Sequence, residues 1–173
     1  MDKENPPKGH IRPMTLEDVE VVHQIDLRSF STPWPARSYW FEVSQNEAAR
    51  CWVIESQGDD GQSQIVAMAV LWFIVDEIHL ATIAVHPDFR GMGFGKWLLA
   101  HALLAASREG ARKAFLEVRS GNLTAQKLYR DFGFEVTGIR PHYYRDNMED
   151  ALLMTLDPIP VRLLQQIDQM YSK

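Results

Sequence analysis

The sequence predicts a mixed α/β (α+β) fold, in which one central sheet carries helices on both faces. Segments with strand-like and helix-like patterns follow one another along the 173 residues. In the middle of the chain, a strand runs through a glycine-rich loop into a helix and on to another strand, as in a crossover connection. The length suits one domain with a single core, which needs no disulfide or metal.

The first half of the chain is expected to contain two helices and three strands. Thr15 and Asp18 have the spacing of a capping box, which opens a helix that ends near Phe30. The prolines at positions 33 and 35 stop that helix, and a second one begins near Ala36. Apolar runs predict strands, and a polar turn at 58–61 joins the last two as a hairpin: 10–14, 51–54 and 65–73.

The second half alternates strands with helices. The helix after the glycine loop has apolar residues at helical spacing and stops near Gly110, and a second helix is ended by Gly133. The predicted strands lie at 78–85, at 114–118, from 134 onward, around 143–144 and at 151–156, and the helix ended by Gly133 spans 122–132. We expect one domain over 9–157, a disordered lead at 1–8, and a tail at 158–173 with a short helix at 161–170.

Composition and charge exclude several classes of protein. The formal net charge of −5 argues against nucleic acid as a direct partner, since binding its backbone needs clustered Lys and Arg, whereas a basic substrate would be tolerated. The first eight residues do not form a signal peptide, and the apolar run at 65–75 is too short to span a membrane. A single cysteine, Cys51, rules out an internal disulfide and is expected in the core. We therefore expect a soluble, cytoplasmic protein.

The glycine-rich loop predicts an anion-binding site. Alternating glycines allow a tight turn with outward N–H groups, and the helix that follows adds unpaired donors. A Walker loop is excluded because Arg90 stands at its first glycine position and Trp97 replaces its hydroxyl residue; the dinucleotide fingerprint also fails on spacing. After Val85 and Pro87, the loop reads Arg90, Gly91, Met92, Gly93, Phe94, Gly95, Lys96. This pattern resembles the pyrophosphate-binding loop of the GNAT acetyltransferases, which hold acetyl-coenzyme A (acetyl-CoA).

Acetyl transfer from a thioester to an amine needs more than a phosphate cradle. The thioester carbonyl must be polarised, the amine must lose a proton, and the leaving thiolate must gain one. Backbone N–H groups of Ile83, Ala84 and Val85 suffice for the first task if this strand is locally unpaired.

Two side chains are the leading candidates for the proton transfers, and His79 is a third. Glu117 lies on a strand, facing away from its apolar neighbours Leu116 and Val118, where a carboxylate is costly unless it is solvated, paired or functional. It is a candidate base acting through water, and the alternative is an ion pair with Arg119 on the same face. Tyr129 is a candidate acid, and its alternative role is packing. His79 is kept as a second candidate base.

A second set of residues extends the resemblance over roughly 9–157. Leu116 to Arg119, Asn122, Ala125, Tyr129 and Gly133-Phe134 are similar to the second signature of GNAT protein N-terminal acetyltransferases, and Phe30 to Trp34, Asp76-Glu77, Arg140 and Glu149 to Ala151 continue it. The pattern resembles the RimI-type ribosomal-protein-alanine N-acetyltransferases. The resemblance implies that Glu117 is the general base, Tyr129 the general acid, the loop and Asn122 the acetyl-CoA site, and that three aromatic side chains lie near the peptide: Trp34, Tyr143 and Tyr144.

The sequence thus predicts an acetyl-CoA-dependent N-acetyltransferase that modifies a protein N-terminal α-amine by direct transfer. The N-terminal alanine of a small-subunit ribosomal protein is expected as substrate on resemblance alone. Two alternatives stay open: an enzyme acting on a small-molecule amine or a lysine side chain, and a CoA-binding module without turnover. The histidines show no metal-ligand spacing, so no metal is predicted.

Overall fold

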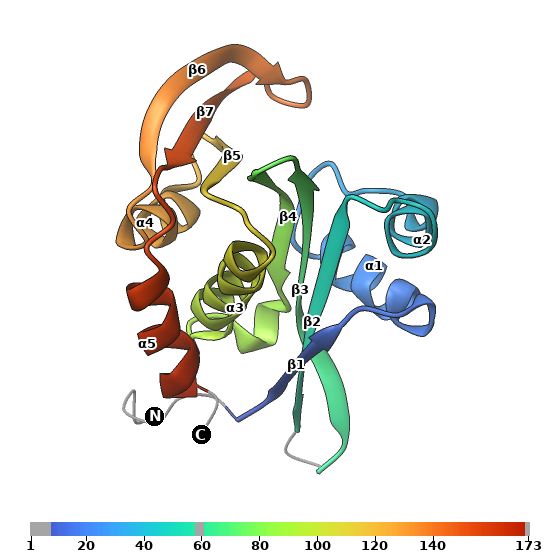
Figure 1. Cartoon of the computed structure of the whole chain (residues 1–173). Helices are drawn as coiled ribbons and strands as arrows, with labels where there is room; N and C mark the ends of the chain where they lie inside the picture. The colour runs from blue at the N-terminus through green and yellow to red at the C-terminus, as the bar shows by residue number, and fades with distance from the viewer. Residues whose placement is uncertain (1–7, 58–60, 172–173) are drawn as a thin grey trace.

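The computed structural model describes residues 8–57 and 61–171 and contains one seven-stranded sheet (Figure 1). Across the sheet the strands run in the order β1-β2-β3-β4-β5-β7-β6. Their bounds are β1 His10–Pro13, β2 Ala49–Gln57, β3 Ser63–Ile74, β4 Glu77–Val85, β5 Lys113–Arg119, β6 Glu135–Tyr144 and β7 Glu149–Leu156. Most of the predicted turn at 58–61, and the predicted lead up to residue 7, lie outside the described residues.

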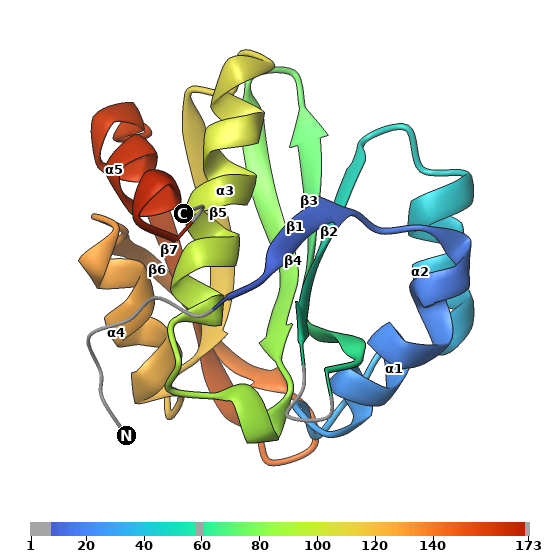
Figure 2. The same ribbon diagram turned by 90° about the horizontal axis from the view of Figure 1, so that it is seen from below.

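The helices cover both faces of the sheet, as predicted. Figure 2 shows α1 and α2 on one side, and α3, α4 and α5 on the other. Two clusters of buried apolar side chains match these layers: the larger joins the sheet to α3, α4 and α5, and the smaller joins it to α1 and α2. The helices are α1 Val19–Leu27, α2 Ala36–Ser44, α3 Phe94–Arg108, α4 Leu123–Asp131 and α5 Val161–Tyr171.

The sheet is mixed because of one connection. All strand pairs are antiparallel except β4 and β5, which are parallel and are joined through α3. Antiparallel neighbours need only a tight turn, whereas parallel neighbours need a crossover, which α3 supplies here. The crossover expected from the sequence is therefore confirmed, and it places the glycine-rich loop between the end of β4 and the start of α3.

The end of the domain differs from the prediction in one respect. The segments near 134–136 and 143–144, which the sequence suggested as separate, form the single strand β6. Register shifts next to Gly138 and after Arg140, together with a left-handed residue at His142 (φ 54°), break its alternation. These irregularities bend the β6–β7 hairpin over one end of the sheet (Figure 1).

A partly buried ion pair ties β1 to the first helical turn. Asp18, at the end of a short 3-10 turn (Leu16–Asp18), accepts two hydrogen bonds from the Arg12 guanidinium at 2.6 and 2.8 Å. It also accepts bonds from the backbone N–H and hydroxyl of Thr15. The Arg12 bonds, helped by those from Thr15, lower the pKa of Asp18 to about 2.

We predict that Asp18→Asn lowers the free energy of unfolding by about 2 kcal/mol at pH 7. Because the folded-state pKa is depressed, this stabilisation is complete above about pH 4 and is lost as the pH falls towards 2. Urea unfolding at a series of pH values measures it, with Glu47→Gln as an exposed control. A difference that stays constant down to pH 3 would contradict the prediction.

Candidate active site

Strands β4 and β5 are paired only over the first part of their length and then separate. Their parallel pairing runs from Glu77 and Lys113 to Leu80 and Leu116 and then stops, although both strands continue. In the same place β4 carries a register shift against β3, next to Thr82. From this point onward, the side of β4 that faces β5 has no strand partner there.

The alternation of hydrogen bonds shows which backbone groups are left open. The His86 N–H donates to the Val66 carbonyl of β3 at 2.8 Å. Every second residue of an antiparallel strand bonds to the same neighbour, so the residues in step with His86, namely Ala84 and Thr82, also bond to β3. Ile83 and Val85 are out of step and direct their N–H and C=O groups towards β5. Of the three residues at 83–85 that the sequence predicted as locally unpaired, Ile83 and Val85 face the side without a strand partner, whereas Ala84 is in step with His86 and pairs with Met68 of β3.

The glycine-rich loop turns directly from β4 into α3. Gly91 and Gly93 have left-handed backbone angles, with φ of 76° and 95°, which other residues adopt only under strain. A Cβ on Gly91 would meet no atom within 4 Å, and one on Gly95 would lie in ordinary van der Waals contact with Val85, at 3.4 Å. The first bond of α3 runs from the Trp97 N–H to the Gly93 carbonyl.

This geometry leaves donors available at the start of α3. The N–H groups of Phe94, Gly95 and Lys96 precede the first helical bond and therefore have no partner within the helix. The Arg90 side chain instead donates to the Val85 carbonyl at 3.1 Å and to the Ser29 hydroxyl at 3.1 Å. Met92 is largely exposed. The loop is a cradle of backbone donors with two cations: Arg90, whose guanidinium bonds to the two neutral oxygens just named, and Lys96 in the first turn of α3.

Glu117 lies on β5 just beyond the point where β4 leaves it. The strand alternates as predicted: Leu116 and Val118 are buried, whereas the Glu117 side chain is 30% exposed. Its carboxylate forms an ion pair with Arg140 at 2.7 Å and accepts a hydrogen bond from Tyr143, which raises the pKa of that phenol. The alternative of a Glu117–Arg119 ion pair is wrong, because Arg119 points to other carboxylates.

Tyr129 is buried where α4 meets the sheet. Its side chain is only 6% exposed and packs edge-to-face on Phe134, with ring centroids 5.8 Å apart. Burial raises the pKa of the Tyr129 phenol well above its ordinary value, and Tyr144 raises it further. Tyr144 also interacts electrostatically with Glu117, so these three side chains share one region. Tyr129 therefore holds its proton throughout the neutral range.

Arg119 ties the β6–β7 hairpin to the segment between α1 and α2. Its guanidinium lies 3.8 Å from the ring centre of Tyr144 and bonds to Asp146 at 2.9 Å and Glu149 at 3.2 Å. It also donates to the Ser31 hydroxyl at 3.0 Å, which in turn donates to Asp146 at 2.6 Å. These bonds from Ser31 and Arg119 lower the pKa of Asp146, so this carboxylate stays charged.

Sequence reasoning did not assign this Arg119 cluster. Glu149 is also held by the Gly121 N–H at 2.6 Å, which fixes the hairpin against the start of α4. One available signal was the period of two on β5, which puts Arg119 on the same face as Glu117. The other was the concentration of acidic residues in the hairpin turn after Tyr144.

The structure places the remaining predicted site residues in three different regions. Tyr143 and Tyr144 are in contact, with ring centroids 5.2 Å apart, and both lie by Glu117. Asn122 is exposed at the start of α4, where its side-chain oxygen accepts from the Ala125 N–H at 3.1 Å. Trp34 instead packs in an aromatic group with Tyr39 and Trp72, in the smaller core.

Two further candidate groups are accounted for by packing. His79 stacks on Phe115, with ring centroids 5.2 Å apart, where β4 and β5 are still paired. Cys51 is partly buried, and burial raises the pKa of its thiol to about 12, so it remains protonated. Within 8–57 and 61–171, no three His, Cys, Asp or Glu residues come together as a metal site, and no helix is long and apolar enough to cross a membrane.

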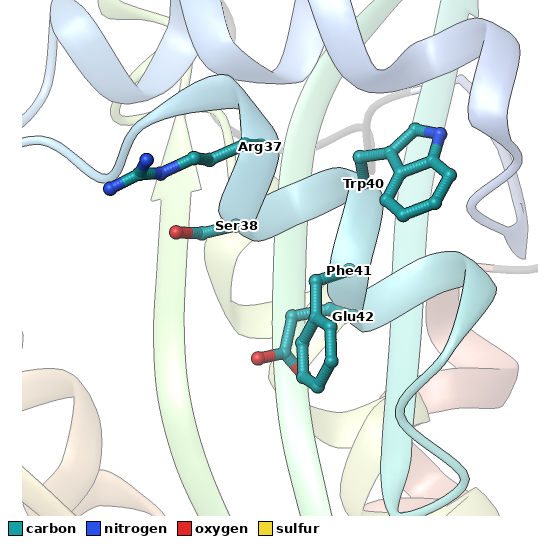
Figure 3. Close-up of a pocket in the computed structure, with 5 residues that line it drawn as sticks. All are labelled: Arg37, Ser38, Trp40, Phe41 and Glu42. Atoms are coloured by element: carbon teal, nitrogen blue, oxygen red, sulfur yellow. The ribbon is translucent and has the colours of Figure 1, made fainter.

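A shallow groove lies along α2, and none of the predicted site residues lines it. Figure 3 shows its side chains projecting from the helix. Trp40 and Phe41 are each 47% exposed. Glu42 accepts hydrogen bonds from Trp72 and Asn46 at 2.9 and 2.7 Å. The lining residues are Arg37, Ser38, Trp40, Phe41 and Glu42.

Comparison with known proteins gives consistent matches. Residues 19–134 match the model of the acetyltransferase (GNAT) family. A Bacillus subtilis protein provisionally named a [ribosomal protein bS18]-alanine N-acetyltransferase is 37% identical over 147 residues, covering 85% of this chain and 94% of that protein. The Escherichia coli K12 [ribosomal protein bS18]-alanine N-acetyltransferase is 31% identical, covering 84% and 95%. The crystal structure of the Escherichia coli ribosomal-protein-S18-alanine N-acetyltransferase superposes with a TM-score of 0.78 at 31% identity, covering 87% and 94%.

Proposed function

The chain belongs to the acetyltransferase (GNAT) family, and from that premise we propose that it transfers acetyl from acetyl-CoA to a protein N-terminal α-amine. The proposed substrate is the N-terminal alanine of ribosomal protein bS18, which the relatives' names specify for those proteins. The chain spans nearly the whole length of these relatives, which supports carrying over the whole activity. The reaction is then cytoplasmic, where ribosomal proteins are made.

The residues present suit acetyl-CoA, the acetyl donor that GNAT enzymes use. The left-handed glycines open a cradle at Gly91 that a side chain would fill, and the N–H groups at the start of α3 favour a pyrophosphate there. Lys96 adds a positive charge, and Asn122 lies at the start of the neighbouring helix. The N–H groups of Ile83 and Val85 and the Ile83 carbonyl can pair with an extended amide chain, as an added strand would, whereas the Val85 carbonyl already accepts a hydrogen bond from Arg90.

In the proposed reaction, each proton transfer is assigned to one side chain of the protein. The neutral amine nitrogen attacks the thioester carbonyl carbon, and the Glu117 carboxylate, acting through water, takes the proton that this nitrogen loses as the C–N bond forms. Backbone N–H groups of β4 stabilise the oxyanion while the C–N bond forms. The C–S bond then breaks, and the Tyr129 hydroxyl donates its proton to the thiolate. Glu117 ends protonated and Tyr129 deprotonated, and solvent restores both.

One observation carries this proposal: Glu117 lies at the point where β4 and β5 separate, beside Tyr143 and Tyr144 and next to open β4 backbone. An amine held at Glu117 is then close to a thioester held along β4. An N-terminal α-amine suits a carboxylate base because its pKa of about 8 leaves part of it neutral at working pH. A lysine amine, with a pKa above 10, needs a stronger base.

Mass spectrometry on two peptides tests the substrate class. Both peptides begin with alanine and carry one internal lysine, and one of them is blocked at its N-terminus. We expect acetylation of the free peptide alone. Acetylation of both would indicate a lysine acetyltransferase. If neither is modified although acetyl-CoA binds, the enzyme acts on another amine.

The Arg119 cluster gives a further prediction, because it holds the hairpin that carries Tyr143 and Tyr144. We expect Arg119→Met to raise the peptide KM about tenfold, since the hairpin loses its anchor, while the KM for acetyl-CoA stays within about twofold. Steady-state kinetics with each substrate varied in turn measures both values. Arg112→Met, which removes an exposed arginine just before β5, is the matched control. An equal rise in both KM values would contradict a local role.

A further inference from the structure

The C-terminal tail forms a helix that packs firmly on the domain. α5 runs beside α3, as Figures 1 and 2 both show. Leu164 and Ile167 of α5 are buried in the larger apolar cluster, together with Leu98, Leu99 and other side chains of α3. This burial accounts for the docking of the helix. It does not explain the polar and aromatic contacts of the last turn.

The last turn of α5 converges on the first turns of α3. The Tyr171 ring stacks on the Trp97 indole, with centroids 5.9 Å apart and planes 15° from parallel. The Trp97 ring N–H donates to the Asp168 carboxylate at 3.3 Å, and His101 lies 3.2 Å from the same oxygen. Tyr171, Trp97, Asp168 and His101 therefore fix the end of α5 against the N-terminal half of α3.

Tyr171 also reaches the glycine-rich loop itself. A Cβ built on Gly93 would lie 2.8 Å from the Tyr171 hydroxyl and 3.0 Å from its ring carbon Cε1, closer than side chains approach one another. The phenol thus packs directly on the Gly93 backbone. Gly93 is the residue before α3, with φ of 95°, and the next glycine back in the loop, Gly91, has open space beside it. Tyr171 therefore covers the loop at Gly93, whereas the space beside Gly91 is open.

We propose that Tyr171 is a positioning residue for the coenzyme site: it holds the glycine-rich loop in its bound shape. The proposal rests on the proposed acetyl-CoA role of that loop. Glycines have more conformational freedom than other residues, so a loop with two of them, Gly91 and Gly93, pays an entropic penalty when it closes on a ligand. A ring packed on Gly93 and anchored on Trp97 removes part of that freedom in advance, which raises affinity.

Isothermal titration of the full-length protein with coenzyme A tests this. We expect Tyr171→Ala to raise the Kd for coenzyme A about tenfold, because the loop loses the ring that packs on Gly93. Tyr171→Phe keeps the ring and its stacking on Trp97, and should stay within about threefold of wild type. Met170→Ala removes an exposed neighbour on the same helix and should change nothing. Leu164 and Ile167 remain in place in all three variants, and thermal unfolding verifies that each is folded.

Kinetics separates positioning from general destabilisation. Tyr171→Ala should raise the KM for acetyl-CoA while leaving kcat and the KM for the alanine peptide within about twofold. An unchanged Kd for coenzyme A, or an equal rise in the peptide KM, overturns the proposal. Because titration needs no peptide, its result stands apart from the proposed function: failure to acetylate an alanine peptide would leave the Kd comparison intact.

Discussion

Glu117→Gln should lower kcat by roughly two to three orders of magnitude while the Kd for coenzyme A stays unchanged. Glutamine matches the shape of glutamate and can keep contacts with Arg140 and Tyr143, but it cannot accept the proton of the attacking amine. The loss should therefore appear in the chemical step. Steady-state kinetics with an alanine peptide, paired with coenzyme A titration, measures the two effects separately.

A matched control and a clear counter-result accompany this variant. Glu135→Gln makes the same change on an exposed position of β6 and should leave kcat unaffected. If Glu117→Gln retains wild-type kcat, the base lies elsewhere. His79 is then the next residue to replace. It lies on β4 opposite Phe115, which precedes Glu117 by two residues on β5, so His79 and Glu117 lie on the same face of the sheet.

Tyr129→Phe should lower kcat about tenfold to a hundredfold, because the leaving thiolate loses its proton donor. The ring stays, so its packing on Phe134 and the fold should be preserved. In the wild-type enzyme, burial raises the pKa of Tyr129, so its ionisation should not reduce kcat at any pH below about 10. A kcat–pH profile of both proteins measures this.

The comparison with Tyr143→Phe sharpens the result. Tyr143 also has a hydroxyl near the site, but it is half exposed and bonded to Glu117 rather than buried on α4. We expect its loss to affect the peptide KM more than kcat. If Tyr129→Phe keeps full kcat, then Tyr129 is a packing residue and water protonates the thiolate.

Local patterns in the sequence predicted much of the site. The glycine spacing after Val85 indicated a tight loop, and two of its glycines do have left-handed angles. The alternation around Glu117 correctly placed its carboxylate away from the core. These features depend on residues close together in the chain, where period and spacing are informative.

The partners of Glu117 and Arg119 could not be read the same way. Arg140 reaches Glu117 from β6, which is separated from β5 by β7 in the sheet, so their contact depends on strand order and register. Ser31 meets Asp146 across 115 positions of sequence. The continuity of β6 was also missed, because Gly138 and the bulges weaken its strand pattern. Such contacts follow from the assembled sheet rather than from local preference.

Acetylation of unmodified, full-length bS18 by the wild-type and Glu117→Gln proteins tests the central claim most directly. Fragmentation mass spectrometry locates the acetyl group, and a time course gives the rate. We predict one acetyl group on the N-terminal alanine nitrogen with the wild-type enzyme, and at least a hundredfold slower appearance of the same product with Glu117→Gln. Acetyl groups on lysine side chains, or equal rates for the two proteins, would contradict it.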